Sequence, residues 1–239
     1  MINLKPILIV GASTPIARAY AACCAKVGHP LILADGEADE VSVIASDLKI
    51  RYGVSTEVVI YDACGDAAAV ELAQLADTRD FAVLATFYSI KSDRNNLGEM
   101  LQVNCVSVAK LFETFIDVSY AKRRSPLLLA VSSIAGDRGR QSNYPYGASR
   151  AALDAYLSGL RNRAYHLGIH VMTIKHGFLK LAGGENSDSP LAVSVERVAG
   201  DIFSASQKKR NTLYTPWFWG FIMWVIRSIP ESIFKRLKL

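Results

Sequence analysis

LLLAVSSIAGDRGRQSNYPYGASR, residues 127–150, is the stretch that decides the fold of this chain. It begins with five apolar residues and continues with Ser132 and Ser133, a run typical of a strand that is buried on both faces of a sheet. Thirteen positions after Ser133, a helical segment is predicted to begin at Tyr146. A buried strand followed by a helix is the repeating unit of a parallel α/β sheet.

The same alternation of apolar runs and helical stretches extends along the chain in both directions. Strands are predicted at 4–10, 30–34, 56–61, 81–86, 126–132, 169–175 and 211–215. Helices are predicted at 15–28, 37–52, 66–77, 96–121, 146–167 and 194–206. The pattern predicts an α/β fold, a Rossmann-like doubly wound parallel sheet of about seven strands with helices on both faces.

The composition indicates one folded domain followed by a tail. Of the 239 residues, 51% are hydrophobic and 21% are charged, which excludes a disordered chain. We expect residues 1–215 to form the α/β domain and residues 216–239 to form an amphipathic C-terminal segment. The apolar run 7–10 is short and leads into a glycine, so it indicates a first strand and not a signal peptide. A cytoplasmic location is therefore expected.

The four cysteines, Cys23, Cys24, Cys64 and Cys105, have no metal-ligand spacing, and no metal site is predicted. Cysteine in an alanine-rich helix behaves as a small hydrophobic residue, as expected for the adjacent pair. We expect all four to be buried structural thiols, with a redox role as the alternative.

Ser133, Tyr146 and Arg150 supply a hydroxyl, a phenol and a permanent cation. Because Arg150 comes four residues after Tyr146, the two lie one above the other on a helix. Together at the carboxyl end of a strand, such groups can polarise a carbonyl and give its oxygen a proton. A cation beside the phenol favours the phenolate, which makes the tyrosine useful near neutral pH. These three residues are therefore predicted to be catalytic.

A second candidate site follows the first predicted strand. Gly11 supplies a tight turn there, which lets backbone N–H groups approach a pyrophosphate. Ser13, Thr14, Pro15 and Ile16 follow it and are predicted to line the phosphate site. Pro15 removes one N–H donor but is acceptable in the first turn of a helix. The alternative is a purely structural turn between a strand and a helix.

Asp35 ends the second predicted strand, where the ribose of an adenosine would lie. Its carboxylate can accept hydrogen bonds from ribose hydroxyls and would repel a 2′-phosphate, so NAD(H) is preferred over NADP(H) as the predicted cofactor. The alternative is a solvated aspartate in a turn.

Taken in order, these residues resemble the short-chain dehydrogenase/reductase family over roughly residues 5–215. The resemblance implies an NAD(P)-dependent oxidoreductase in which Tyr146 donates the proton and Ser133 holds the substrate oxygen. It also implies a homodimer or homotetramer. Further site residues implied are Asn104, which would keep a helix open around a water, Asp62 at the adenine, and Ala85 and Gly177 beside the cofactor.

The chain departs from the family pattern at several of these positions. Arg150 stands where the family has lysine, and an arginine cannot lose a proton for a relay. Ala85-Thr86-Phe87-Tyr88 stands where the family has Asn-Asn-Ala-Gly, and His176-Gly177 replaces Pro-Gly. Leu181 falls where a threonine usually holds the nicotinamide amide. Together, Pro15, Leu181 and Arg150 favour a second hypothesis, a catalytically silent scaffold of the same fold.

Residues 133–144 and 225–237 are also similar to the decaprenylphosphoryl-2-keto-ribose reductase branch. That narrower resemblance implies reduction of a keto sugar carried on a polyprenyl phosphate, in cell-envelope polysaccharide synthesis. The alternative within enzymes is a soluble 3-oxoacyl reductase whose basic tail meets an acidic acyl carrier.

All three tryptophans, Trp217, Trp219 and Trp224, lie close to the end of the chain, within an uncharged segment at 215–226. A helix that spans a membrane needs about 20 apolar residues, so this segment is too short to cross one. Aromatic residues of this kind favour the interface between a membrane and water.

The charge pattern supports the same interpretation. The whole chain has a net charge of +5, yet residues 207–239 alone contain seven basic residues and a single acid, Glu231. We expect residues 216–239 to rest on an anionic membrane surface at its cytoplasmic face. The alternative is that the segment packs on the domain or at a subunit interface. No nucleic-acid partner is expected.

Overall fold

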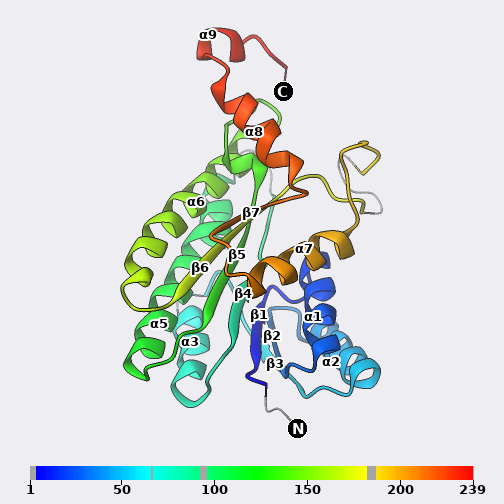
Figure 1. The fold of residues 1–239 in the computed structure, drawn as a ribbon, viewed down its shortest axis with the longest axis vertical. Coiled ribbons are helices and arrows are strands. Elements are labelled where there is room, and N and C mark those ends of the chain that lie inside the picture. The colour runs from blue at the N-terminus through cyan, green and yellow to red at the C-terminus, as the bar shows by residue number, and fades with distance from the viewer. Residues whose placement is uncertain (1–3, 66, 92–95, 182–186, 239) are drawn as a thin grey trace.

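The computed structural model describes residues 4–65, 67–91, 96–181 and 187–238. Within these residues, one sheet of seven strands has the order β3-β2-β1-β4-β5-β6-β7, and every pair of neighbours is parallel (Figure 1). Helices cover both faces of the sheet. The predicted doubly wound α/β fold is therefore confirmed.

The strands lie within a few residues of their predicted positions. They are β1 Ile7–Val10, β2 Leu31–Asp35, β3 Thr56–Ile60, β4 Val83–Thr86, β5 Leu127–Ser133, β6 His170–His176 and β7 Thr212–Thr215. β1, β2, β4 and β5 are buried along their whole length, because an all-parallel sheet is covered on both faces. This is why their sequences are continuous apolar runs.

The helices include one unexpected interruption. The described helices are α1 Pro15–Val27, α2 Ala38–Tyr52, α3 Ala68–Thr78, α4 Leu97–Leu101, the π-helix η1 Gln102–Val106, α5 Ser107–Ala121, the 3-10 helix η2 Ile134–Gly136, α6 Tyr144–Tyr165, α7 Val195–Gln207, α8 Phe218–Ser228 and α9 Glu231–Phe234. The prediction of one continuous helix over 96–121 is wrong, since η1 separates α4 from α5. The side-chain bonds of Asn104, described below, hold that irregular turn.

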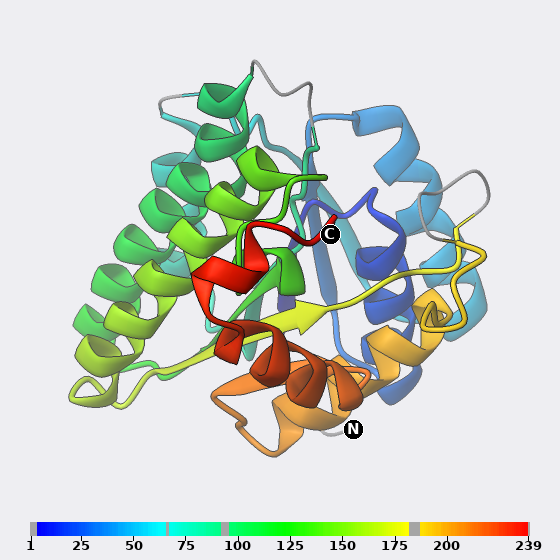
Figure 2. The same ribbon diagram turned by 90° about the horizontal axis from the view of Figure 1, so that it is seen from above.

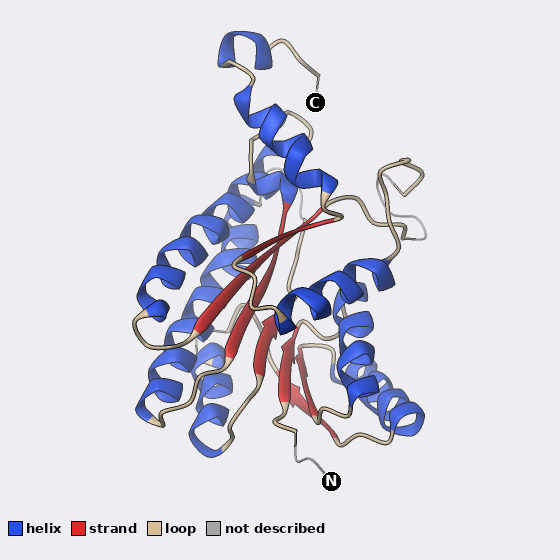
Figure 3. Ribbon diagram, viewed as in Figure 1, coloured by secondary structure: helices blue, strands red, loops and turns tan. Residues whose placement is uncertain are grey.

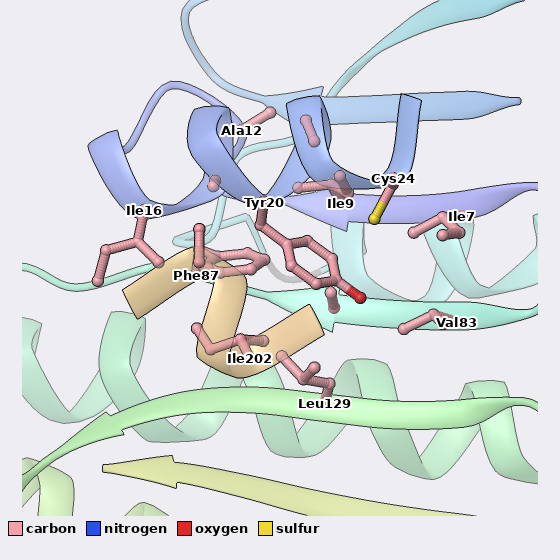
Figure 4. Packing of buried hydrophobic residues seen from close by; sticks show 14 of the residues in the cluster. Ile7, Ile9, Ala12, Ile16, Tyr20, Cys24, Val83, Phe87, Leu129 and Ile202 are labelled. Carbon is pink, nitrogen blue, oxygen red and sulfur yellow. The ribbon is translucent and has the colours of Figure 1, made fainter. Parts of the chain in front are cut away.

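Two hydrophobic cores lie on opposite faces of the sheet, each between the sheet and one of the two helix layers that Figure 2 shows. α1, α2 and α7 enclose one core, and α3, α5 and α6 enclose the other. Within the first core, the Tyr20 ring lies 5.4 Å from the Phe87 ring, between α1 and the end of β4 (Figure 4). Because side chains alternate along a strand, Ile7 and Ile9 of β1 enter one core and Leu8 and Val10 enter the other.

The cysteines follow the prediction only in part. Cys24 is buried, and Cys23 and Cys105 are half-buried. Cys64 is exposed, so the prediction that all four are buried is wrong for this residue. It lies in the turn after β3, where its backbone N–H donates to the Asp62 carboxylate.

α8 and α9 lie beyond the carboxyl ends of the strands (Figure 3). One face of α8 packs on the domain through Trp219 and Met223, which contact Ile134 in a small third core. The opposite face exposes Trp217, Phe221 and Trp224. None of the described helices is both long and apolar enough to span a membrane.

Arg138 fastens this C-terminal segment to the domain. Its Nη1 donates to the carbonyl oxygens of Ile226 at 2.7 Å and Ile229 at 2.6 Å, and its Nη2 lies 3.0 Å from the Glu231 carboxylate. The guanidinium also lies 3.7 Å from the centre of the Phe234 ring. One side chain thus binds carbonyl oxygens at and just beyond the end of α8 and also holds α9.

We expect Trp219→Ala to lower the free energy of unfolding by about 3–5 kcal/mol, because the indole is buried and fills the third core. Trp224→Ala is the matched control from the same helix, and with 65% of that side chain exposed we expect a change of at most about 0.5 kcal/mol. Urea unfolding of both variants measures the difference. Equal effects would contradict the docking of α8 described here.

Candidate active site

Ser133 and Tyr146 meet at the carboxyl edge of the sheet. Ser133 is the last residue of β5, and its Oγ accepts a hydrogen bond from the Ala135 N–H at 3.2 Å. Tyr146 lies in the first turn of α6. A Cβ on Gly147 would come within 2.8 Å of the Ala135 carbonyl oxygen, so only glycine lets α6 pack this closely on the loop that follows Ser133.

The Tyr146 phenol lies among groups that favour its ionised form. Its Oη is 3.2 Å from Ser89 Oγ, and the Arg150 guanidinium carbon is 5.2 Å from the centre of its ring. Burial raises the pKa of Tyr146, but the Arg150 cation and hydrogen bonding to Ser89, Arg150 and Ser133 outweigh it and lower the pKa below its ordinary value. The arrangement is suited to moving a proton at the phenol oxygen.

Arg150 is 1% exposed and is held by neutral acceptors. Its Nη1 donates to the Val131 carbonyl at 3.2 Å, and its Nη2 donates to the Tyr88 carbonyl at 3.0 Å and to Asn104 Oδ1 at 3.3 Å. In the part of the chain that the structure describes, no carboxylate forms an ion pair with it. Its positive charge therefore acts on the Tyr146 phenol without a competing anion.

Asn104 is fully buried and connects three segments of the site. Its Oδ1 accepts from the Ile90 N–H at 2.9 Å, and its Nδ2 donates to the Ile90 carbonyl at 2.9 Å and to Ser149 Oγ at 3.0 Å. It lies in the π-helical turn η1, and such turns occur frequently at functional sites. The water predicted beside this residue remains a prediction.

A cavity of about 250 Å³ opens beside Ser133 and Tyr146. It is lined by Ser89, Lys91, Ser133, Ile134, Ala135, Arg140, Asn143, Tyr146, His176, Gly177, Phe178, Leu179 and Leu181. Burial lowers the pKa of His176 to about 4, so its imidazole is neutral near pH 7. Burial likewise lowers the pKa of Arg140, whose Nε is buried and has no hydrogen-bond partner among the described residues. The cavity wall therefore carries cationic and apolar side chains.

The predicted phosphate turn has the expected backbone. Gly11 has a φ of 78°, and a Cβ there would come within 2.8 Å of the Tyr88 nitrogen. α1 begins at Pro15, and Thr14 at its N-cap makes no side-chain cap, since the Thr14 hydroxyl donates instead to the Gly11 carbonyl at 2.8 Å. Within the described residues, the first-turn N–H groups of Ile16 and Ala17 thus have neither a helical partner nor a cap, which suits them to bind an anion.

Asp35 is buried, so the alternative of a solvated turn aspartate is wrong. Its Oδ2 accepts from the Ser13 N–H at 2.9 Å, and its Oδ1 accepts from the Gly36 N–H at 2.8 Å and the Tyr88 hydroxyl at 3.0 Å. Asp62 is exposed at the neighbouring edge. Asp35 therefore lies at the crevice, and its carboxylate already accepts three hydrogen bonds from the protein.

The other two residues predicted to lie beside the cofactor are Ala85 and Gly177. Ala85 is fully buried inside β4, one residue before its end, and its side chain belongs to the core. The edge of the crevice at β4 is therefore formed by the residues that follow Thr86. Gly177 lies after β6 under the Trp219 indole, whose Nε1 would come within 1.9 Å of a Cβ at this position.

Sequence reasoning missed three residues that border the site. Ser89 contacts Tyr146, Tyr88 contacts both Arg150 and Asp35, and Arg140 lines the cavity. The departure of Tyr88 from the family glycine was the one signal available in the sequence. Ser89 and Arg140 lie in loops, where no periodicity indicates which way a side chain points.

A doubly wound parallel sheet with Ser133, Tyr146 and Arg150 at its carboxyl edge, beside a glycine turn, defines a Rossmann-type oxidoreductase. The model of the short chain dehydrogenase family matches residues 5–190, and the chain belongs to this family.

Three similar proteins match nearly the whole chain. An uncharacterized oxidoreductase of Mycobacterium tuberculosis is 25% identical over 243 residues, covering 97% of this chain and 96% of the relative. A short-chain dehydrogenase of Sphingobium yanoikuyae, solved with NADPH, has a TM-score of 0.78 and 17% identity, covering 96% of this chain and 98% of its own. One from Burkholderia phymatum, solved with NAD, has a TM-score of 0.80 and 18% identity, covering 93% of both. At these identities the two structures show the fold alone.

Arg150→Gln is expected to raise the pKa of Tyr146 above its ordinary value of 10.0, because burial would then be only weakly opposed. Arg150→Lys keeps a cation and should keep the lowered pKa. The measurement is the change in phenolate absorbance with pH. For the wild type and for each Arg150 variant, subtracting the titration of the same protein with Tyr146→Phe isolates this residue among the ten tyrosines. An unchanged titration in Arg150→Gln would show that the cation does not act on Tyr146.

The same shift predicts a pH dependence of stability. The folded-state pKa of Tyr146 lies below the unfolded value, so its ionisation stabilises the fold fully above pH 10.0, and that contribution is lost as the pH falls through the folded-state pKa. Tyr146→Phe should remove this contribution.

Proposed function

We propose that this protein is an NAD(H)-preferring carbonyl reductase, with NADP(H) as the second option, and that it reduces a keto sugar linked to a polyprenyl phosphate at the cytoplasmic face of a membrane. The observation that carries the proposal is the Tyr146 phenol, which lies between Ser133 and the buried Arg150 beside a cavity. A homodimer or homotetramer remains part of the proposal.

The residues on the nucleotide side fit a dinucleotide. The Gly11 turn and the uncapped N-terminus of α1 would receive the pyrophosphate, and the Asp35 carboxylate would receive a ribose and repel a 2′-phosphate. Complexes of structural neighbours with NAD and with NADPH support a nicotinamide cofactor and do not distinguish the two. When bound, such a cofactor supplies the hydride that reduces the carbonyl carbon.

The proton for the new hydroxyl comes from Tyr146 in this proposal, while Ser133 holds the carbonyl oxygen. The phenolate that remains is stabilised by the Arg150 cation. Arginine cannot give up a proton, so it cannot return one to Tyr146. Ser89 can instead pass a proton from water to Tyr146, because its hydroxyl lies 3.2 Å from the phenol oxygen and the residue is exposed to water.

The cavity wall supports a substrate that carries negative charge. Arg140 lines the cavity with a partly desolvated guanidinium, and Lys91 lies on the same wall. A phosphate brought to Arg140 would accept charge-assisted hydrogen bonds and offset the cost of burying the guanidinium. The exposed aromatic face of α8, close to this cavity through Trp219 and Gly177, supports delivery of the substrate from a lipid surface.

We expect Arg140→Gln to raise KM about tenfold or more for a keto sugar bearing a prenyl phosphate, because a charged hydrogen bond to the phosphate is lost. The same variant should reduce the keto sugar without the phosphate as the wild type does. Initial rates of NADH oxidation with both substrates measure this.

Tyr146→Phe is the negative control for chemistry, and it should slow both substrates by about 10²–10⁴-fold. Turnover of 3-oxoacyl thioesters in preference to either sugar would favour the acyl reductase instead. No turnover of any carbonyl by the wild type would favour the silent scaffold.

We expect the wild type to sediment with anionic liposomes, and the double variant Phe221→Ser, Trp224→Ser to bind them about tenfold or more weakly, since two exposed aromatic side chains no longer enter the interface. The buried face of α8 is untouched in this variant. Tyr120→Ser, Tyr165→Ser is the matched control, because both tyrosines are exposed on other helices. Equal partition of all three proteins into the soluble fraction would remove the membrane from the proposal.

A further inference from the structure

Tyr88 extends across the nucleotide side of the sheet edge. The residue follows β4, and its hydroxyl oxygen lies 3.0 Å from Asp35 Oδ1 and 3.1 Å from the Tyr61 carbonyl oxygen, so its one proton is shared between these two acceptors. Asp35 ends β2, and Tyr61 follows β3. Since the strand order is β3-β2-β1-β4, a side chain that starts after β4 and reaches the ends of β2 and β3 must cross the end of β1.

The end of β1 is the glycine turn that would receive the dinucleotide. The Tyr88 backbone lies directly against this turn, because a Cβ on Gly11 would come within 2.8 Å of the Tyr88 nitrogen. The Tyr88 ring continues toward Tyr61, with 5.8 Å between the ring centres. The side chain thus lies over the strand ends where an adenosine and its ribose would bind in a fold of this type.

The hydroxyl of Tyr88 also uses an acceptor that a ribose would need. The Asp35 carboxylate already receives two backbone N–H groups, from Ser13 and Gly36, and the phenol adds a third donor. Burial and the neighbouring Asp35 carboxylate raise the pKa of Tyr88 well above its ordinary value, so the phenol stays neutral and keeps its proton for this bond. An incoming ribose hydroxyl would compete for the same oxygen.

We propose that Tyr88 is a built-in competitor for the adenosine half of the cofactor, whose phenol takes the place of a ribose hydroxyl on Asp35 and has to move before the dinucleotide binds. This inference rests on the proposed cofactor use. In this proposal Tyr88 lowers the affinity for the cofactor, because it reduces the binding free energy that the adenosine half contributes. The backbone carbonyl of the same residue holds Arg150, so the movement concerns the side chain alone.

The test is calorimetric titration of the full chain with ADP-ribose, with NADH and with reduced nicotinamide mononucleotide, which lacks the adenosine. Tyr88→Phe keeps the ring and removes the competing bond, so we expect ADP-ribose and NADH to bind about tenfold more tightly. Tyr88→Ala also clears the ring and should bind them more tightly still. The mononucleotide should bind the wild type and both variants alike.

Tyr61→Phe is the matched control, because it removes a neighbouring buried tyrosine hydroxyl that makes no contact with Asp35, and it should leave all three affinities unchanged. Thermal unfolding without ligand verifies that each variant is folded. Equal or weaker binding of ADP-ribose by both Tyr88 variants, with the wild type binding NADH, would overturn the role of Tyr88 and leave the proposed function standing. Failure of every protein to bind any of the three ligands would overturn both.

Discussion

The burial of one positive charge is the constraint on which the rest of the site depends. Arg150 has no anionic partner among the described residues, and removing a guanidinium from water costs several kcal/mol unless polar groups surround it. The Val131 carbonyl, the Tyr88 carbonyl and the Asn104 amide provide that surrounding. These groups come from β5, from the segment after β4 and from the π-helical turn, so the requirement to solvate Arg150 fastens three parts of the chain around Tyr146.

The order of the strands determines how this charge relates to the rest of the crevice. The order in which the chain adds strands reverses between β1 and β4, and ligands of open α/β sheets bind outside the strand ends at such a point. Ser133, Tyr146 and Arg150 lie on the β5 side of it, whereas Gly11 and Asp35 lie on the other side. Tyr88 follows β4, next to this point, and contacts both sides of the crevice. Its carbonyl accepts a hydrogen bond from Arg150, and its hydroxyl donates one to Asp35.

The sequence was sufficient for the sheet because buried parallel strands must be apolar throughout, as Leu127–Val131 is, and because a glycine is needed where β1 turns into α1. It was sufficient to bring Ser133 and Tyr146 together, since a strand end and the next helix start share one edge. It did not reveal the π-helical turn, because Asn104 bonds to Ile90 and Ser149, which have no periodic relation to it. Nor did it distinguish Trp219, which is buried, from Trp224, which is exposed, because only the docked position of α8 separates them.

Arg138 lies in the loop between Ser133 and Tyr146, and it is also the residue that holds α8 and α9. The loop between Ser133 and Tyr146 and the C-terminal segment are therefore held in place by the same side chain. An interaction that stabilises the docked segment therefore also restrains, through Arg138, the loop that connects Ser133 to Tyr146. The last two helices therefore brace the loop between Ser133 and Tyr146, and removing them would remove the contacts through which Arg138 is held.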